Sequence, residues 1–118
     1  AAAIGGQLLV CGGYNSMENV ASCERFDPAQ HVWEPLRPMS AARSGAAVAV
    51  LESSGKALYI CGGSTFSECA GATLSSVERL RPQDGPSAAP GGAEGAFWEE
   101  VAPMHAQRAC PGAVALHG

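Results

Sequence analysis

The sequence has few charges and few aromatic residues, and it lacks a long apolar run. Of its 118 residues, 15% are charged and 6% are aromatic, whereas 47% are hydrophobic. Seven Lys and Arg against eleven Asp and Glu give a net charge of −4, so there is no basic patch for a nucleic acid. No stretch is long enough to cross a bilayer, and residues 1–10 lack the basic start of a signal peptide. We therefore expect a globular chain without nucleic-acid or membrane partners.

The residue clusters of a metal site or a hydrolytic enzyme are also missing. His31, His105 and His117 are scattered, with no ligand spacing to Cys, Asp or Glu. There is no Gly-x-Ser-x-Gly element, and no Gly pair is followed by the Lys-Ser/Thr of a phosphate loop. We expect no catalytic residue, no cofactor and no metal.

What the sequence does contain is an internal repeat. Residues 8–13 (LLVCGG) recur as residues 58–63 (LYICGG), 50 positions later, and residues 24–26 (ERF) recur as 78–80 (ERL), 54 positions later. Four further landmarks recur 65 positions later: Trp33, Pro38, Met39 and Arg43 return as Trp98, Pro103, Met104 and Arg108. A repeat of this length predicts a propeller or an array, in which one unit cannot bury its apolar faces without neighbours.

Each unit reads as four short antiparallel strands. Residues 45–51 are small and apolar at odd and even positions alike, which predicts a strand buried on both faces. A turn at 53–55 leads to a strand at 56–61, and a third strand follows at about 76–80. In the first copy a turn at 27–30 precedes a fourth strand that carries Trp33. The fold class is therefore all-β, a partial propeller with four-stranded antiparallel blades.

The repeat boundaries divide the chain into three parts. Residues 1–43 hold the last three strands of one blade and the blade-to-blade loop, and residues 44–108 hold a complete blade. Residues 109–118 supply the first strand of the next blade, so the ring is not closed in this chain. A low-complexity insertion rich in Pro, Gly, Ala and Ser occupies 82–95, where we expect a mobile surface loop.

This pattern resembles the Kelch repeat. The resemblance rests on the Gly pairs, the spaced Trp residues and the Pro-Met-x-x-x-Arg elements at 38–43 and 103–108. Structural roles therefore fall to the motif residues Gly12, Gly13, Trp33, Gly62, Gly63 and Trp98. We expect both Trp residues to pack between sheets rather than to bind a ligand.

Residues 24–28 and 38–45 are similar to the subset of Kelch proteins that also carry BTB and BACK domains. That resemblance implies a protein-interaction module, the cytoplasmic substrate-recognition propeller of a cullin-RING ubiquitin ligase adaptor. The cullin-RING ligase would be engaged through domains outside these residues. The alternative is a cytoskeletal scaffold that binds actin, and a third, more distant one is a copper oxidase, for which no Tyr/His cluster is visible.

The five cysteines are odd in number and include no C-x-x-C pair. Cys11 and Cys61 occupy the same repeat position, so they should sit in equivalent strands of different units. We expect small buried hydrophobic residues in a reducing compartment rather than a disulfide scaffold.

Candidate partner-binding residues lie in loops that open on one end of a propeller. Tyr14 and Phe66 are the expected aromatic anchors. Arg43 and Arg108 have two interpretations, a structural Arg that holds loop carbonyls or a carboxylate, and an Arg that pairs with an acidic residue of a bound peptide. The full candidate set is Tyr14, Asn15, Ser16, Glu18, Asn19, Arg43, Ser64, Phe66 and Arg108.

Overall fold

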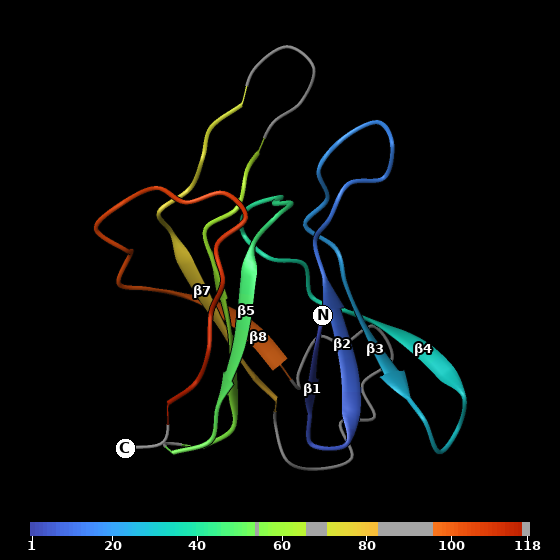
Figure 1. Cartoon of the computed structure of the whole chain (residues 1–118). Coiled ribbons are helices and arrows are strands. Elements are labelled where there is room, and N and C mark those ends of the chain that lie inside the picture. The colour runs from blue at the N-terminus through green and yellow to red at the C-terminus, as the bar shows by residue number, and fades with distance from the viewer. Residues whose placement is uncertain (54, 66–70, 83–95, 117–118) are drawn as a thin grey trace.

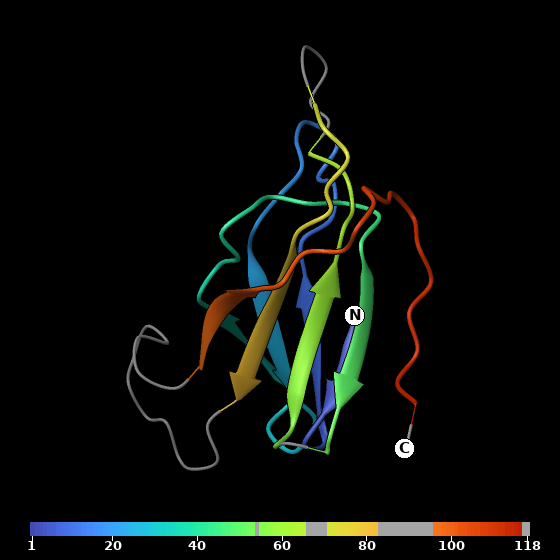
Figure 2. The same cartoon turned by 90° about the vertical axis from the view of Figure 1, so that its left-hand side faces the viewer.

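The computed structural model describes residues 1–53, 55–65, 71–82 and 96–116, and these form two four-stranded antiparallel sheets (Figures 1 and 2). The first sheet has the order β1-β2-β3-β4 and the second the order β5-β6-β7-β8. The predicted all-β architecture of unclosed four-stranded blades is confirmed. The strands are β1 (Ala2–Ile4), β2 (Gln7–Cys11), β3 (Cys23–Asp27), β4 (Val32–Leu36), β5 (Ala47–Leu51), β6 (Ala57–Cys61), β7 (Val77–Pro82) and β8 (Ala96–Val101).

The first sheet has one strand more than the sequence predicted. Residues 2–4 form β1, which pairs with β2 through the register Ala2↔Leu9 and Ile4↔Gln7. The hairpin is possible because Gly5 and Gly6 both adopt positive φ, at 58° and 76°. A three-residue, alanine-rich strand has no alternation to mark it, so the prediction of three strands in residues 1–43 was wrong.

The C-terminal part differs as well. Residues 109–118 were expected to form a first strand, but the described residues 109–116 are not in a strand. Instead, the Cys110 N–H donates to the Gly45 carbonyl at 2.7 Å. A strand requires the edge of a further sheet, which these residues do not meet in this chain. Of the predicted insertion at 82–95, Pro82 ends β7 and pairs with Ala96, and residues 83–95 lie outside the described residues.

The core lies between the two sheets. Leu58 and Leu80 of the second sheet are each 1% exposed, and they pack against Ile4 and Leu9 of the first. A second cluster joins Cys23 of the first sheet and Ile60 of the second to Met39 of the connection that follows β4. Each fully buried aliphatic side chain contributes about 1.5–3 kcal/mol. We call the face of the first sheet that meets β5–β8 its inner face, and the opposite side its outer face.

Three of the connections between strands emerge at one end of the two sheets. In Figures 1 and 2 the β2–β3 connection, the β4–β5 connection and the described parts of the β6–β7 connection all lie at the upper end. The tight turns at 5–6 and 27–31 lie at the opposite end (Figure 1). No helix in the described part of the chain is long and apolar enough to span a membrane.

Candidate functional site

The β2–β3 connection is a stiff loop built on Asn15. Tyr14 and Asn19 close it with an isolated antiparallel bridge. Within the loop the Asn15 Oδ1 accepts hydrogen bonds from the N–H groups of Met17, at 3.1 Å, and Glu18, at 3.0 Å. The Asn15 N–H in turn donates to the Glu18 carbonyl at 3.1 Å. These bonds satisfy the loop backbone from within, so the loop keeps its shape without help from a partner.

The same loop presents two large apolar side chains to solvent. Tyr14 is 56% exposed and Met17 is 79% exposed. Between them Ser16 adopts a left-handed conformation with φ 76°, which costs a residue other than glycine about 1–2 kcal/mol. An aromatic and a thioether side chain held out on a stiff loop are the side chains that protein interfaces favour.

The second sheet adds a neighbouring loop. The Asn19 Nδ2 donates to the Ser64 carbonyl at 2.9 Å, which joins the β2–β3 connection to the β6–β7 connection. Ser64 also exchanges both main-chain hydrogen bonds with Ser44, at 2.8 and 3.0 Å. The structure therefore brings Asn19 and Ser64 of the predicted set together, with Thr65 next to them. Phe66 lies outside the described residues.

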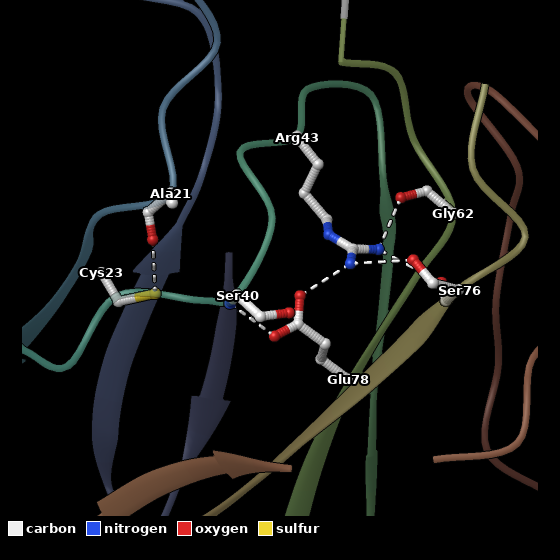
Figure 3. A network of polar contacts seen from close by, with 7 residues as sticks. All are labelled: Ala21, Cys23, Ser40, Arg43, Gly62, Ser76 and Glu78. Carbon is white, nitrogen blue, oxygen red and sulfur yellow. Dashed lines mark hydrogen bonds and ion pairs between the residues drawn. The ribbon is translucent and has the colours of Figure 1, made fainter. Parts of the chain in front are cut away.

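Arg43 lies buried between the sheets (Figure 3). Its Nη1 donates to the carbonyls of Gly62, at 2.9 Å, and Ser76, at 3.1 Å. Its Nη2 donates to the Ser76 Oγ at 3.1 Å and to the Glu78 Oε2 at 2.7 Å. The other Glu78 oxygen accepts from the Ser40 N–H at 2.7 Å. Arg43 and Glu78 are each only 1% exposed, so we place Arg43 in the contact between sheets rather than on the exposed loops.

The two halves of the chain repeat the backbone contacts of this connection. The Gly13 N–H donates to the Arg43 carbonyl at 2.8 Å, and the Gly63 N–H donates to the Arg108 carbonyl at 2.8 Å. At Gly62, where φ is 66°, a Cβ would lie 2.5 Å from the Arg108 carbonyl oxygen, so only glycine fits. The repeat seen in the sequence is thus a repeat of three-dimensional contacts.

Comparison with known proteins agrees with this repeat. The model of the Kelch motif family matches residues 1–40, which span the whole first sheet and the start of the following connection. Residues 1–40 carry a Kelch motif. Over 61 residues it is 38% identical to Kelch-like protein 35 of the mouse, a match that covers 52% of this chain and 10% of that relative. Kelch repeats form protein-interaction modules.

The two Trp residues occupy equivalent places in the two Kelch units but different surroundings. Trp98 packs against the core clusters, and its Nε1 donates to the Arg37 carbonyl of the first unit at 3.0 Å. Trp33 is 48% exposed on the outer face, where its ring lies 5.1 Å from that of Phe26. Glu24, the counterpart of Glu78, is exposed on the same face. The outer face of the first Kelch unit therefore has the residue types that the second unit buries.

Each Kelch unit also has an ion pair across its third and fourth strands. Arg25 pairs with Glu34 in the first unit, and Arg79 pairs with Glu99 in the second. The Arg79 Nε lies 3.1 Å from the Glu99 Oε2, and this hydrogen bond lowers the pKa of Glu99 and raises that of Arg79. Both carboxylates are well exposed, so these pairs contribute little to stability.

Sequence reasoning missed the partners of Arg43. Glu24 and Glu78 were visible as repeated residues, and this recurrence was the available signal. A glutamate in a predicted strand is normally solvated, so nothing in the sequence marked Glu78 as buried. Within the described residues no group of three or more His, Cys, Asp or Glu side chains is arranged to hold a metal ion.

Proposed function

We propose that the loop end of these two Kelch units holds a segment of a partner protein. The observation that carries the proposal is the pair of exposed apolar side chains, Tyr14 and Met17, on the loop that Asn15 stiffens. Because the loop bonds are internal, little conformational freedom is lost when a partner binds. Ser16, Glu18 and the chain around Ser64 supply polar groups around these two anchors.

We further propose that the partner is a client of a cullin-RING ubiquitin ligase and that the propeller belongs to its adaptor. Support comes from the resemblance of residues 38–45 to the BTB-BACK-Kelch subset and from the match to a Kelch-like protein. A cytoplasmic location is supported by the free thiols of the described cysteines Cys11, Cys23, Cys61 and Cys110.

Arg108 receives a different assignment from the loop residues. It stands in the second unit where Arg43 stands in the first, and its backbone makes the equivalent bond to Gly63. We assign it the equivalent contact with a following Kelch unit, in which its guanidinium would pair with a buried glutamate as Arg43 does with Glu78.

The experiment is affinity capture of the intact protein that contains this chain, from cells in which the proteasome is inhibited. Wild type is compared with Tyr14→Ala and Met17→Ala, and with Phe97→Ala as the matched control. Phe97 is exposed to a similar degree, 54%, but lies near the start of β8, at the opposite end of the sheet. The proposal predicts a cullin and an accumulating client, with the client lost in the two loop variants and kept in the control.

Two results would count against the proposal in different ways. Recovery of actin or other filament proteins without a cullin would replace the adaptor by a cytoskeletal scaffold. Recovery of the same client by wild type and by both loop variants would remove the recognition role of Tyr14 and Met17.

A further inference from the structure

Two cysteines stand directly opposite each other in the first sheet. Cys11 ends β2 and Cys23 begins β3, and the two are register partners. On the next rung the Gly12 N–H donates to the Ser22 carbonyl at 2.9 Å. Hydrogen-bonded and non-hydrogen-bonded pairs alternate along an antiparallel ladder, so Cys11 and Cys23 form a non-hydrogen-bonded pair. Such pairs have Cα atoms about 4.5 Å apart, within the range of about 4.4–6.8 Å that a disulfide spans.

The two side chains share the inner face and contact the same neighbours. Cys23 is 2% exposed and belongs to a core cluster with Met39 and Ile60, and Cys11 packs against that cluster. The Cys23 Sγ donates a weak hydrogen bond to the Ala21 carbonyl at 3.6 Å (Figure 3). A hydrogen bond between the two thiol groups raises the pKa of Cys11 and lowers that of Cys23.

The second sheet lacks this arrangement. Cys61, the counterpart of Cys11, stands opposite Val77. The Gly62 N–H donates to the Ser76 carbonyl at 3.0 Å, so Cys61 and Val77 form the same kind of non-hydrogen-bonded pair. The chain thus contains its own reference position, with the same backbone and one thiol instead of two.

We propose that Cys11 and Cys23 are the site of a reversible disulfide formed under oxidising conditions. With hydrogen peroxide as the oxidant, the thiolate of one of the two cysteines attacks one peroxide oxygen, the O–O bond breaks, and hydroxide leaves. The resulting sulfenic acid is attacked by the sulfur of the other cysteine, the S–O bond breaks, and water leaves with the proton of that thiol. Two thiols and one peroxide give one disulfide and two waters, and a thiol reductant reverses the change.

The disulfide would close the base of the recognition loop. Residues 12–22 lie between the two cysteines and include the loop from Tyr14 to Asn19. Oxidation would fix the ends of β2 and β3 together directly below that loop. This consequence rests on the proposed function, whereas the disulfide itself is tested without any partner.

The test is peroxide treatment of the folded chain, followed by thiol alkylation, digestion and mass spectrometry. Trypsin releases residues 1–25 as one peptide that contains both cysteines, and cleavage after Glu18 separates them. The proposal predicts that the oxidised peptide is two hydrogens lighter than the reduced peptide and carries no alkyl group. Its two halves should stay joined after cleavage at Glu18 until a reductant is added. Cys11→Ser and Cys23→Ser each abolish the link, and Cys61→Ser leaves it intact.

A variant that gains a disulfide tests the proposal independently of the variants that lose one. Val77→Cys should create a second peroxide-dependent link, to Cys61, because the backbone geometry there is the same. Exposed Cys110 reports that the oxidant is active. The proposal is overturned if Cys110 is oxidised while Cys11 and Cys23 both remain alkylated, or if either of them links to another cysteine instead.

Discussion

Glu78→Ala should destabilise the chain more than removal of any other glutamate in the described residues. The Glu78 Oε2 is 2.7 Å from the Arg43 Nη2, and its Oε1 accepts from the Ser40 N–H at 2.7 Å. Without the carboxylate, the Arg43 charge stays buried with only carbonyl and hydroxyl acceptors. Removing one partner of a buried ion pair costs about 3–5 kcal/mol, much of it from the charge left unpaired.

The matched control is Glu24→Ala, because Glu24 occupies the same repeat position but is exposed. This substitution should change the free energy of unfolding by no more than about 0.5 kcal/mol. Glu78→Gln keeps an acceptor for the Ser40 N–H, so its loss of stability should lie between those of Glu24→Ala and Glu78→Ala. This variant keeps the comparison measurable if Glu78→Ala does not fold. The assay is equilibrium urea unfolding followed by Trp fluorescence. Equal losses in Glu78→Ala and Glu24→Ala would refute the buried pair.

Two further predictions follow from the repeat. Trp98→Ala should lower the free energy of unfolding of this chain by about 3 kcal/mol, the lower end of the range for a packed Trp. Trp33→Ala should lower it by about 1 kcal/mol, the value of its ring contact. Equal losses of the two variants in urea unfolding would contradict the difference in burial. Arg79 lowers the pKa of Glu99, so this carboxylate adds stability above its unfolded value of about 4.5, and the gain is lost as pH falls through the lowered pKa. Glu99→Gln should therefore flatten the acid limb of the melting temperature against pH, and an unchanged limb would exclude this contribution.

The order of strands was predictable because the repeat places equivalent residues in equivalent strands. The two Gly pairs, the two Glu-Arg elements and the two Trp residues each fall at corresponding positions of the two sheets. The strand at Ala2–Ile4 was not predictable from pattern, because three residues are too few to show an alternation. Residues 109–116 resemble a first strand in composition, but a strand forms only against the edge of a sheet.

The candidate site was predictable only where a residue's role depends on its own loop. Tyr14 and Asn19 became candidates because both lie in a connection of a rigid scaffold, and Tyr14 also because aromatic residues dominate interface energies. The role of Arg43 depends on Glu78, which lies 35 residues away in the other sheet. A single sequence does not specify which distant group a side chain meets, so both interpretations of Arg43 remained open until the two sheets were seen together.

The most direct test of the recognition surface is amide hydrogen exchange of the intact protein, with and without the client recovered by affinity capture. Residues 14–19 lie at the loop end, and the turn at 27–31 lies at the opposite end of the same sheet (Figure 1). We predict that client binding slows exchange at 14–19 and leaves 27–31 unchanged. Slower exchange at 27–31, with none at 14–19, would place the binding surface at the wrong end of the sheets and contradict the proposed function.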